Sequence, residues 1–79
     1  MEELVRYLLN NLVENPDQVD VSSKDESDKV TVITVKVAKD DIGRVIGRNG
    51  KVAGSIRTIV KSASAKTGKR YIVKIGERD

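Results

Sequence analysis

The fold of this 79-residue chain is decided by the stretch Asp41-Ile42-Gly43-Arg44-Val45-Ile46-Gly47-Arg48-Asn49-Gly50-Lys51-Val52-Ala53. Three of the nine residues from Gly43 to Lys51 are glycine and three are basic. The stretch joins two helical patterns. It therefore brings the backbone N–H groups that open the second helix to the surface beside cationic side chains. That arrangement suits an anion, and phosphate is the anion that fits it best.

The residues before this stretch predict one helix and two strands. Apolar positions spaced three and four apart predict a helix over residues 2–14, with the apolar face Leu4, Val5, Leu8, Leu12 and Val13. Asn15-Pro16 ends it, because the residue before proline disfavours helical angles. Alternation predicts a short strand over residues 19–22, and residues 24–29 form a polar loop. A β-branched run predicts a strand over residues 30–37, whose two faces are Ile33, Val35 and Val37 against Val30, Val32 and Thr34.

The residues around and after the stretch predict two helices and a last strand. A short helix over residues 40–46 begins with two carboxylates, where the helix dipole favours them. A longer helix over residues 51–67 follows, with the buried stripe Val52, Ile56, Ile59, Val60 and Ala63. Gly68 ends that helix, and residues 71–75 form a strand. The predicted order is α-β-β-α-α-β.

Two nucleotide-binding loops can be excluded at the glycine-rich stretch. A Walker loop needs glycine where Val45 stands, and a Ser or Thr hydroxyl for magnesium where Val52 follows Lys51. A dinucleotide fingerprint also needs glycine at Val45, and it must leave a strand rather than a helix. What remains is a helix–GxxG–helix in which Gly47 and Gly50 are the glycines.

In this context the chain resembles a KH domain of type II, and looks closest to the small bacterial single-KH RNA-binding proteins of the KhpA family. The resemblance rests on residues 41–53, on Ile56-Arg57-Thr58-Ile59-Val60-Lys61 and on the first helix ending at Asn15-Pro16. It covers residues 1–79 as one KH domain. It implies an α+β fold in which three helices pack on one face of a three-stranded mixed sheet. It also implies binding of about four nucleotides of single-stranded RNA, with the GxxG loop clamping the backbone.

The chemistry of the loop agrees with that expectation. Glycine at positions 47 and 50 allows a sugar-phosphate backbone to approach the main chain. Arg48 and Lys51 supply charge, and Asn49 can donate to a phosphate oxygen. The short helix supplies an apolar groove for bases, with Val45 and Ile46 divided between core and groove in an order left open. The predicted RNA-binding residues are Ile42, Gly43, Arg44, Val45, Ile46, Gly47, Arg48, Asn49, Gly50, Lys51 and Arg57.

Several residues have a structural interpretation beside a functional one. Gly43 serves either close helix packing or a ligand. Asp40 and Asp41 are interpreted as helix caps rather than as metal or acid–base groups. Tyr71 is assigned to core or edge packing, and with Tyr7 as the only other aromatic residue a base-stacking platform is not expected. The remaining basic residues favour a solvated face over specific contacts: Lys61, Lys66, Lys69 and Arg70.

Composition limits the function classes. The chain has no Cys and no His, which excludes disulfides, thiolate zinc sites and catalysis by Ser–His or Cys–His pairs. We therefore expect no enzyme, no catalytic residues, no metal, no cofactor and no small-molecule substrate. Residues 1–41 carry ten acidic and five basic side chains, a net of −5, and residues 42–79 carry ten basic and two acidic ones, a net of +8. A basic half is typical of nucleic-acid binders, and a solvated lysine-rich surface is the alternative.

The remaining expectations concern location and partners. The acidic start Met1-Glu2-Glu3 and the absence of an apolar run near 20 residues predict a cytoplasmic protein without a membrane span. The resemblance implies a homodimer, or a heterodimer with a larger KH-containing RNA-binding protein. It also implies a role as RNA chaperone or post-transcriptional regulator in cell division and cell shape. The alternative function is a protein-interaction adaptor whose KH fold mainly pairs with another KH-containing protein. Double-stranded DNA is disfavoured, because the cleft beside a GxxG loop should be too narrow for a duplex.

Overall fold

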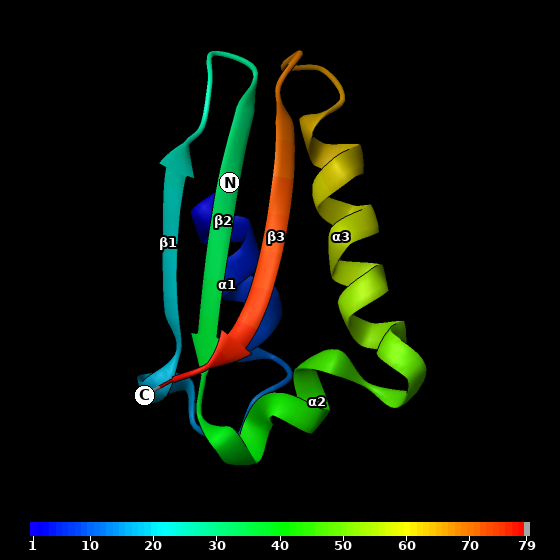
Figure 1. The fold of residues 1–79 in the computed structure, drawn as a ribbon. Coiled ribbons are helices and arrows are strands. Elements are labelled where there is room, and N and C mark those ends of the chain that lie inside the picture. Colours follow the sequence, from blue (N-terminus) through cyan, green and yellow to red (C-terminus); the bar gives the residue numbers. More distant parts are fainter. Residues whose placement is uncertain (79) are drawn as a thin grey trace.

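Three strands form one mixed sheet in the computed structural model, which describes residues 1–78. The strands are β1 (Asp20–Asp25), β2 (Val30–Val37) and β3 (Arg70–Glu77), in the spatial order β1-β2-β3. β1 pairs antiparallel with β2, and β3 pairs parallel with β2. A parallel pair needs a crossover, and α2 (Ile42–Ile46) and α3 (Lys51–Ser64) supply it (Figure 1).

The hydrophobic core lies between one face of this sheet and the helices. In Figure 1, α1 (Glu2–Asn10) lies behind the sheet and α3 runs alongside β3. Ile33, Val35 and Val37 are fully buried on the inner face of β2, as the alternation predicts. The α+β class, the predicted element order and the mixed sheet are confirmed. The buried apolar cluster consists of Val5, Leu9, Val19, Val21, Ile33, Val35, Val37, Val45, Ile56, Val60 and Val73.

Most element boundaries differ from prediction by a few residues. The first helix ends at Asn10 rather than at residue 14, although Leu12 and Val13 still pack against the core from the turn that follows. A 3₁₀ turn at Pro16–Gln18 then leads into β1, which continues to Asp25, into the predicted loop. The short helix begins at Ile42, after a 3₁₀ turn at Lys39–Asp41. At the other end α3 stops at Ser64 and β3 spans two more residues than predicted on its C-terminal side.

The predicted buried stripe of α3 is partly wrong. Ile56 and Val60 are buried, but Ile59 is 42% exposed and Ala63 is exposed. The helix instead buries two small residues, Ala53 and Ser64, in line with Ile56 and Val60. Small residues on this face allow α3 to lie close to the sheet, and the Ser64 hydroxyl is satisfied by the Lys61 carbonyl at 3.0 Å. None of the helices in residues 1–78 is long and apolar enough to span a bilayer.

Candidate functional site

The connection between α2 and α3 has an unusual backbone. Three of its four residues have positive φ: Gly47 at 74°, Asn49 at 57° and Gly50 at 75°. The Gly47 N–H donates to the Gly43 carbonyl at 2.9 Å and closes α2. The Gly50 N–H donates to the Gly47 carbonyl at 3.3 Å and closes the turn, after which α3 begins at Lys51. This tight turn exposes the side chains at its tip.

The two glycines of the loop are needed for different reasons. Gly47 combines φ 74° with ψ 178°, a region that essentially only glycine occupies. A Cβ there would also lie 2.8 Å from the Val52 Cβ and 2.9 Å from the Val52 nitrogen, so residue 47 is packed against the start of α3. Gly50 is left-handed as well, but a Cβ there would meet no atom within 4 Å. Gly47 therefore serves the fold of the loop, and Gly50 leaves open space on its surface.

Two cations and an amide flank Gly50 in the sequence. Arg48, Asn49 and Lys51 are exposed, and within residues 1–78 neither Arg48 nor Lys51 forms a salt bridge. The first N–H groups of the 14-residue helix α3 lie beside them. A helix start carries a partial positive charge and unpaired donors. Together these groups form an electropositive surface suited to a phosphate.

An apolar strip continues from the loop along α2. Ile46 is 37% exposed, whereas Val45 is fully buried, so Val45 belongs to the core and Ile46 to the surface. Val45, predicted among the RNA-binding residues, thus has no side-chain surface for a ligand. Ile42 and Val52 are half-buried and pack against the core from either side of the loop. Ile42, Ile46 and Val52 are the apolar side chains available to a ligand here.

Arg44 forms two ion pairs that the sequence did not predict. Its Nη2 lies 2.7 Å from Glu14 Oε1, and its Nε lies 3.7 Å from Asp41 Oδ1. The pair with Glu14 joins α2 to the segment after α1, and the Arg44 guanidinium thus has two acidic partners within the protein. At Gly43 the structure disfavours the helix-packing account, because a Cβ there would meet nothing within 4 Å.

Asp41 stands at the N-cap position of α2, as the sequence predicts, but its side chain is a buried anchor and not a cap. Its side chain makes no capping hydrogen bond to α2 and is 1% exposed. The carboxylate instead accepts from the Glu14 N–H at 3.0 Å, from the Asn15 N–H at 3.1 Å and from the Asn15 side-chain amide at 3.0 Å. Asp40 is exposed, and no cluster of metal-ligating side chains occurs within residues 1–78. Asp41 therefore fastens the end of the first helical segment to the start of α2.

This anchor predicts an acid-dependent stability. The Glu14 N–H, with Asn15 and Arg44, holds the pKa of the Asp41 carboxyl below its ordinary value of 3.8, although burial acts the other way. A carboxyl whose pKa is lowered by folding stabilises the folded state at any pH above the pKa that the group has in the unfolded chain. That stabilisation is lost as the pH falls through the pKa that the group has in the folded protein. Asp41→Asn is expected to lower the urea concentration at the unfolding midpoint at pH 7. Below pH 4 this midpoint should fall less steeply with pH in the variant than in the wild type. Asp40→Asn is the control, and identical acid profiles for Asp41→Asn and the wild type would contradict the anchor.

Arg57 and three residues assigned to other roles border the far side of the site. The Arg57 Nε donates to the Val73 carbonyl at 3.3 Å and bridges α3 to β3. Lys61, Arg70 and Tyr71 lie around the same crevice and line one pocket with Arg57. The sequence assigned the two cations to a solvated face and the tyrosine to packing. No local pattern in the sequence signals this grouping, because it depends on the return of the chain to pair β3 with β2.

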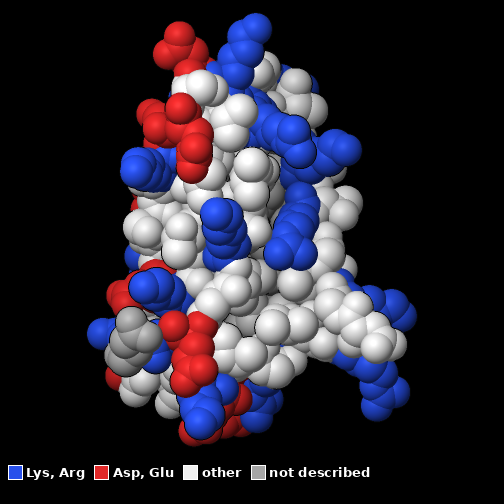
Figure 2. All heavy atoms as spheres, viewed as in Figure 1, with Lys and Arg blue, Asp and Glu red and all other residues white. Residues whose placement is uncertain are grey.

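Charged side chains are distributed unevenly over the face of the molecule that carries the sheet edge and the loop. In Figure 2, viewed as in Figure 1, basic side chains gather over the α3–β3 side and protrude at the lower right, where Figure 1 places the connection between α2 and α3. Acidic side chains in this view lie mainly on the β1–β2 side. On this face, basic side chains therefore predominate on the side that carries the loop.

Comparison with known proteins gives a consistent result. Residues 2–75 match the family model described as KhpA/KhpB, KH domain. The chain is 45% identical over 75 residues to the "RNA-binding protein KhpA" of Caldanaerobacter subterraneus, covering 95% of this chain and 99% of that protein. It is 39% identical over 75 residues to that of Clostridium acetobutylicum, with the same coverage, and 38% identical over 77 residues to that of Listeria monocytogenes, covering 98% of this chain and 100% of that protein. No solved structure matches the chain.

Proposed function

Since the chain belongs to the KhpA/KhpB KH-domain family, we propose that it binds single-stranded RNA through the 47–50 loop and the apolar strip beside it. The observation that carries the proposal is the pair of exposed cations Arg48 and Lys51, which form no salt bridge within residues 1–78 and flank a backbone left open at Gly50. Phosphate contacts fix the strand without reading its sequence. The bases then turn toward the surface of α2.

The apolar strip is the surface on which we place the bases. Ile42, Ile46 and Val52 offer aliphatic contact, and Arg57 closes the strip on the β3 side. A site of this length takes about four nucleotides. Aliphatic contact reads base identity loosely, so selectivity for one sequence is expected to be modest. At Gly43, where an added Cβ would meet no atom within 4 Å, there is room for the strand to pass α2.

We propose a binding protein and not an enzyme, and we extend the proposal to pairing. Without His or Cys the chain lacks the commonest general base and the strongest side-chain nucleophile. One short site binds weakly, and two linked sites raise avidity without new contacts. Tyr7 at 66% exposure and Ile59 at 42% are large apolar side chains that a partner could cover. A second copy or a larger KH-containing protein would each supply a second site.

Salt dependence tests the phosphate contacts directly. If three or four phosphates are contacted, affinity for single-stranded RNA is expected to fall roughly 20- to 50-fold between 50 and 200 mM salt. The reason is that the logarithm of the binding constant falls with the logarithm of the salt concentration with a slope of about −0.7 per phosphate. The measurement is fluorescence anisotropy with a pool of labelled random tetranucleotides at four salt concentrations. An affinity that does not change with salt would overturn the phosphate clamp. Absence of any binding would favour the protein-interaction adaptor instead.

A further inference from the structure

The tip of the 47–50 loop carries an asparagine followed directly by a glycine, Asn49-Gly50. We propose that Asn49 is a site of spontaneous deamidation, and that its conversion to aspartate or isoaspartate weakens RNA binding at this loop. The conversion itself depends only on the chain and on water, whereas its effect on RNA rests on the proposed function. The loop then loses affinity as a protein molecule ages.

The reaction is an attack within the chain followed by hydrolysis. The backbone nitrogen of Gly50 loses its proton and forms a bond to the side-chain carbonyl carbon, Cγ, of Asn49. The bond between Cγ and the side-chain nitrogen breaks, and this nitrogen takes up a proton and leaves as ammonia. Water then opens the five-membered succinimide ring at either of its two carbonyls. One opening gives aspartate, and the other gives isoaspartate, in which the main chain runs through Cγ.

The structure leaves both reacting groups accessible. The Asn49 side chain is exposed, and a Cβ added at Gly50 would meet no atom within 4 Å. No side chain therefore hinders the approach of Cγ to the Gly50 nitrogen. A single hydrogen bond holds that nitrogen in the turn, from the Gly50 N–H to the Gly47 carbonyl at 3.3 Å. This bond is longer than the usual range of about 2.7–3.2 Å.

The turn must open briefly for the attack to occur. In the folded turn Asn49 has φ 57° and ψ 28°. That ψ turns the Gly50 nitrogen nearly opposite to the Asn49 Cβ about the Cα–C bond, whereas the ring needs the two atoms on the same side. The left-handed conformation is unfavourable for a residue with a side chain, and surface loops open locally without unfolding of the domain. RNA bound at the loop is expected to oppose this opening.

The electrostatic surroundings favour the reaction. Negative charge develops on the Gly50 nitrogen as its proton leaves. Arg48 and Lys51 stand on either side of Asn49-Gly50, and neither forms a salt bridge within residues 1–78. Gly50 is also the N-cap of the 14-residue helix α3, whose start carries a partial positive charge. The groups that suit this loop to a phosphate thus also stabilise the charge formed in deamidation.

The other three asparagines lack this combination and serve as controls within the same chain. Asn10 lies in α1 and is followed by Asn11, and Asn11 is followed by Leu12. In both cases the next residue has a side chain that hinders the attack. Asn15 precedes Pro16, whose nitrogen carries no proton to lose. Deamidation is therefore expected at Asn49 well before any other position.

Either product changes the loop where we place the phosphate. The side-chain amide of Asn49 is a donor, whereas a carboxylate is negatively charged and only accepts hydrogen bonds. Isoaspartate also adds one atom to the main chain between Arg48 and Lys51, which alters the turn that positions these cations. Both products are consequently expected to weaken RNA binding.

The first measurement locates the modification and follows its rate. The protein is incubated at neutral and at mildly alkaline pH, with and without a saturating pool of random tetranucleotides. Fragmentation of the intact chain in a mass spectrometer locates each converted residue, and isoaspartyl methyltransferase labels isoaspartate. Conversion is expected at Asn49, faster at the higher pH and slower with RNA. Conversion at Asn49 no faster than at Asn11 would overturn the site.

A matched pair of variants tests the contribution of the loop cations. Arg48→Gln with Lys51→Gln removes the two charges beside Asn49, and Lys24→Gln with Lys66→Gln removes two exposed charges elsewhere. The first variant is expected to convert more slowly than the wild type, and the second at the wild-type rate. Equal rates in the two variants would overturn the role assigned to the cations.

The last measurement is the RNA affinity of the converted protein. Cation-exchange chromatography separates it from unmodified protein, because it carries one more negative charge. By fluorescence anisotropy it is expected to bind the tetranucleotide pool roughly 10-fold more weakly than the unmodified protein. Equal affinities would overturn the effect of deamidation on binding. If unmodified protein bound no RNA, the proposed function would fall, while conversion at Asn49, which is measured by mass, would stand.

Discussion

Replacing Arg48 and Asn49 together with aspartate is expected to reduce single-stranded RNA binding by about 100-fold or more, because two contacts to charged phosphates are worth about 1.5–3 kcal/mol each. Two carboxylates would stand where we place the phosphate. Folding should be retained: both side chains are exposed, and Asp tolerates the left-handed conformation of residue 49 (φ 57°) nearly as well as Asn. The variant thus separates binding from stability.

Amide NMR during RNA titration is the measurement, supported by circular dichroism. In the wild type, shift changes are expected to centre on residues 47–52 and α2, and in the variant to vanish. Gln18→Asp with Lys66→Asp is the control, since it changes the net charge equally at exposed positions away from the loop. Undiminished RNA binding by a folded Arg48→Asp, Asn49→Asp protein would remove the loop from the site. The protein-interaction adaptor would then be the better account.

The second large effect is expected from Gly47→Ala, which should destabilise the protein by about 3 kcal/mol or more. Alanine there must adopt φ 74° with ψ 178°, and its Cβ would overlap Val52 at the start of α3. Val52 packs on the core, so it has little room to move. Urea unfolding followed by circular dichroism measures the loss.

Gly50→Ala is the matched control for that loss. It places the same methyl group in the same loop at a left-handed residue with open space around it, so it should cost only about 1 kcal/mol. Its effect on RNA affinity should exceed its effect on stability, because the methyl group lies where we place the sugar-phosphate backbone. Equal stability losses for the two variants would show that Val52 does not restrict residue 47.

Local patterns predicted the elements that carry the site, and long-range contacts account for the errors. The β-branched run of β2 and the glycines at 47 and 50 act within a few residues, so the sequence alone reveals them. Asp41 has its partners at residues 14 and 15, and Arg44 also pairs with Glu14, which is 30 positions away. No periodicity encodes such pairs. The side-chain cap expected of Asp41 was wrong for that reason, and the pairing of Arg44 with Glu14 was not predicted.

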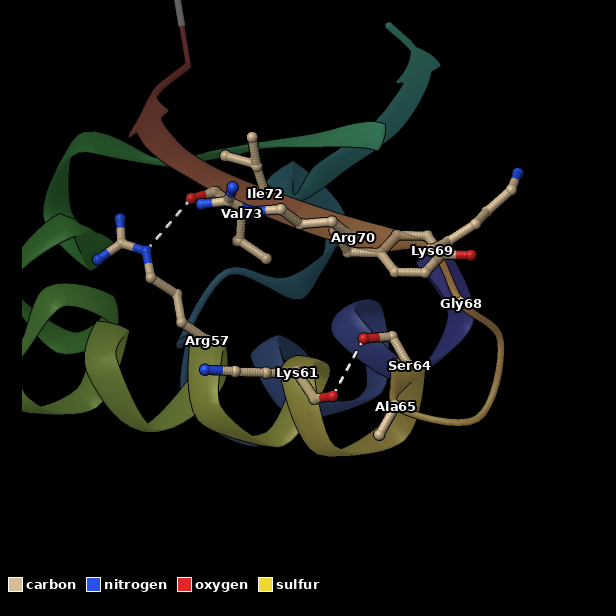
Figure 3. A pocket seen from close by; sticks show the side chains of 10 residues that line it. Arg57, Lys61, Ser64, Ala65, Gly68, Lys69, Arg70, Ile72 and Val73 are labelled. Carbon is tan, nitrogen blue, oxygen red and sulfur yellow. Dashed lines mark hydrogen bonds between the residues drawn. The ribbon is translucent and has the colours of Figure 1, made fainter. Parts of the chain in front are cut away.

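The errors in α3 and at its pocket have a similar origin. The spacing of apolar residues predicted that Ile59 and Ala63 are buried. The face of α3 that packs on the sheet instead includes the small residues Ala53 and Ser64. Likewise, Lys61 and Arg70 are nine positions apart in sequence, and only the return of the chain to β2 brings them to one crevice (Figure 3). The order of charged residues along the chain does not show that β3 returns to pair with β2.

The parallel pairing of β2 with β3 also has a consequence for how the chain folds. Partners such as Val30 with Arg70 and Val37 with Glu77 are separated by 40 residues, and closing a segment of that length costs conformational entropy before any contact compensates it. Non-local pairing of this kind slows folding. The residues between the partners include the whole 47–50 loop. The sheet and the crevice beside β3 can therefore form only after the chain has passed through this loop and returned to β2.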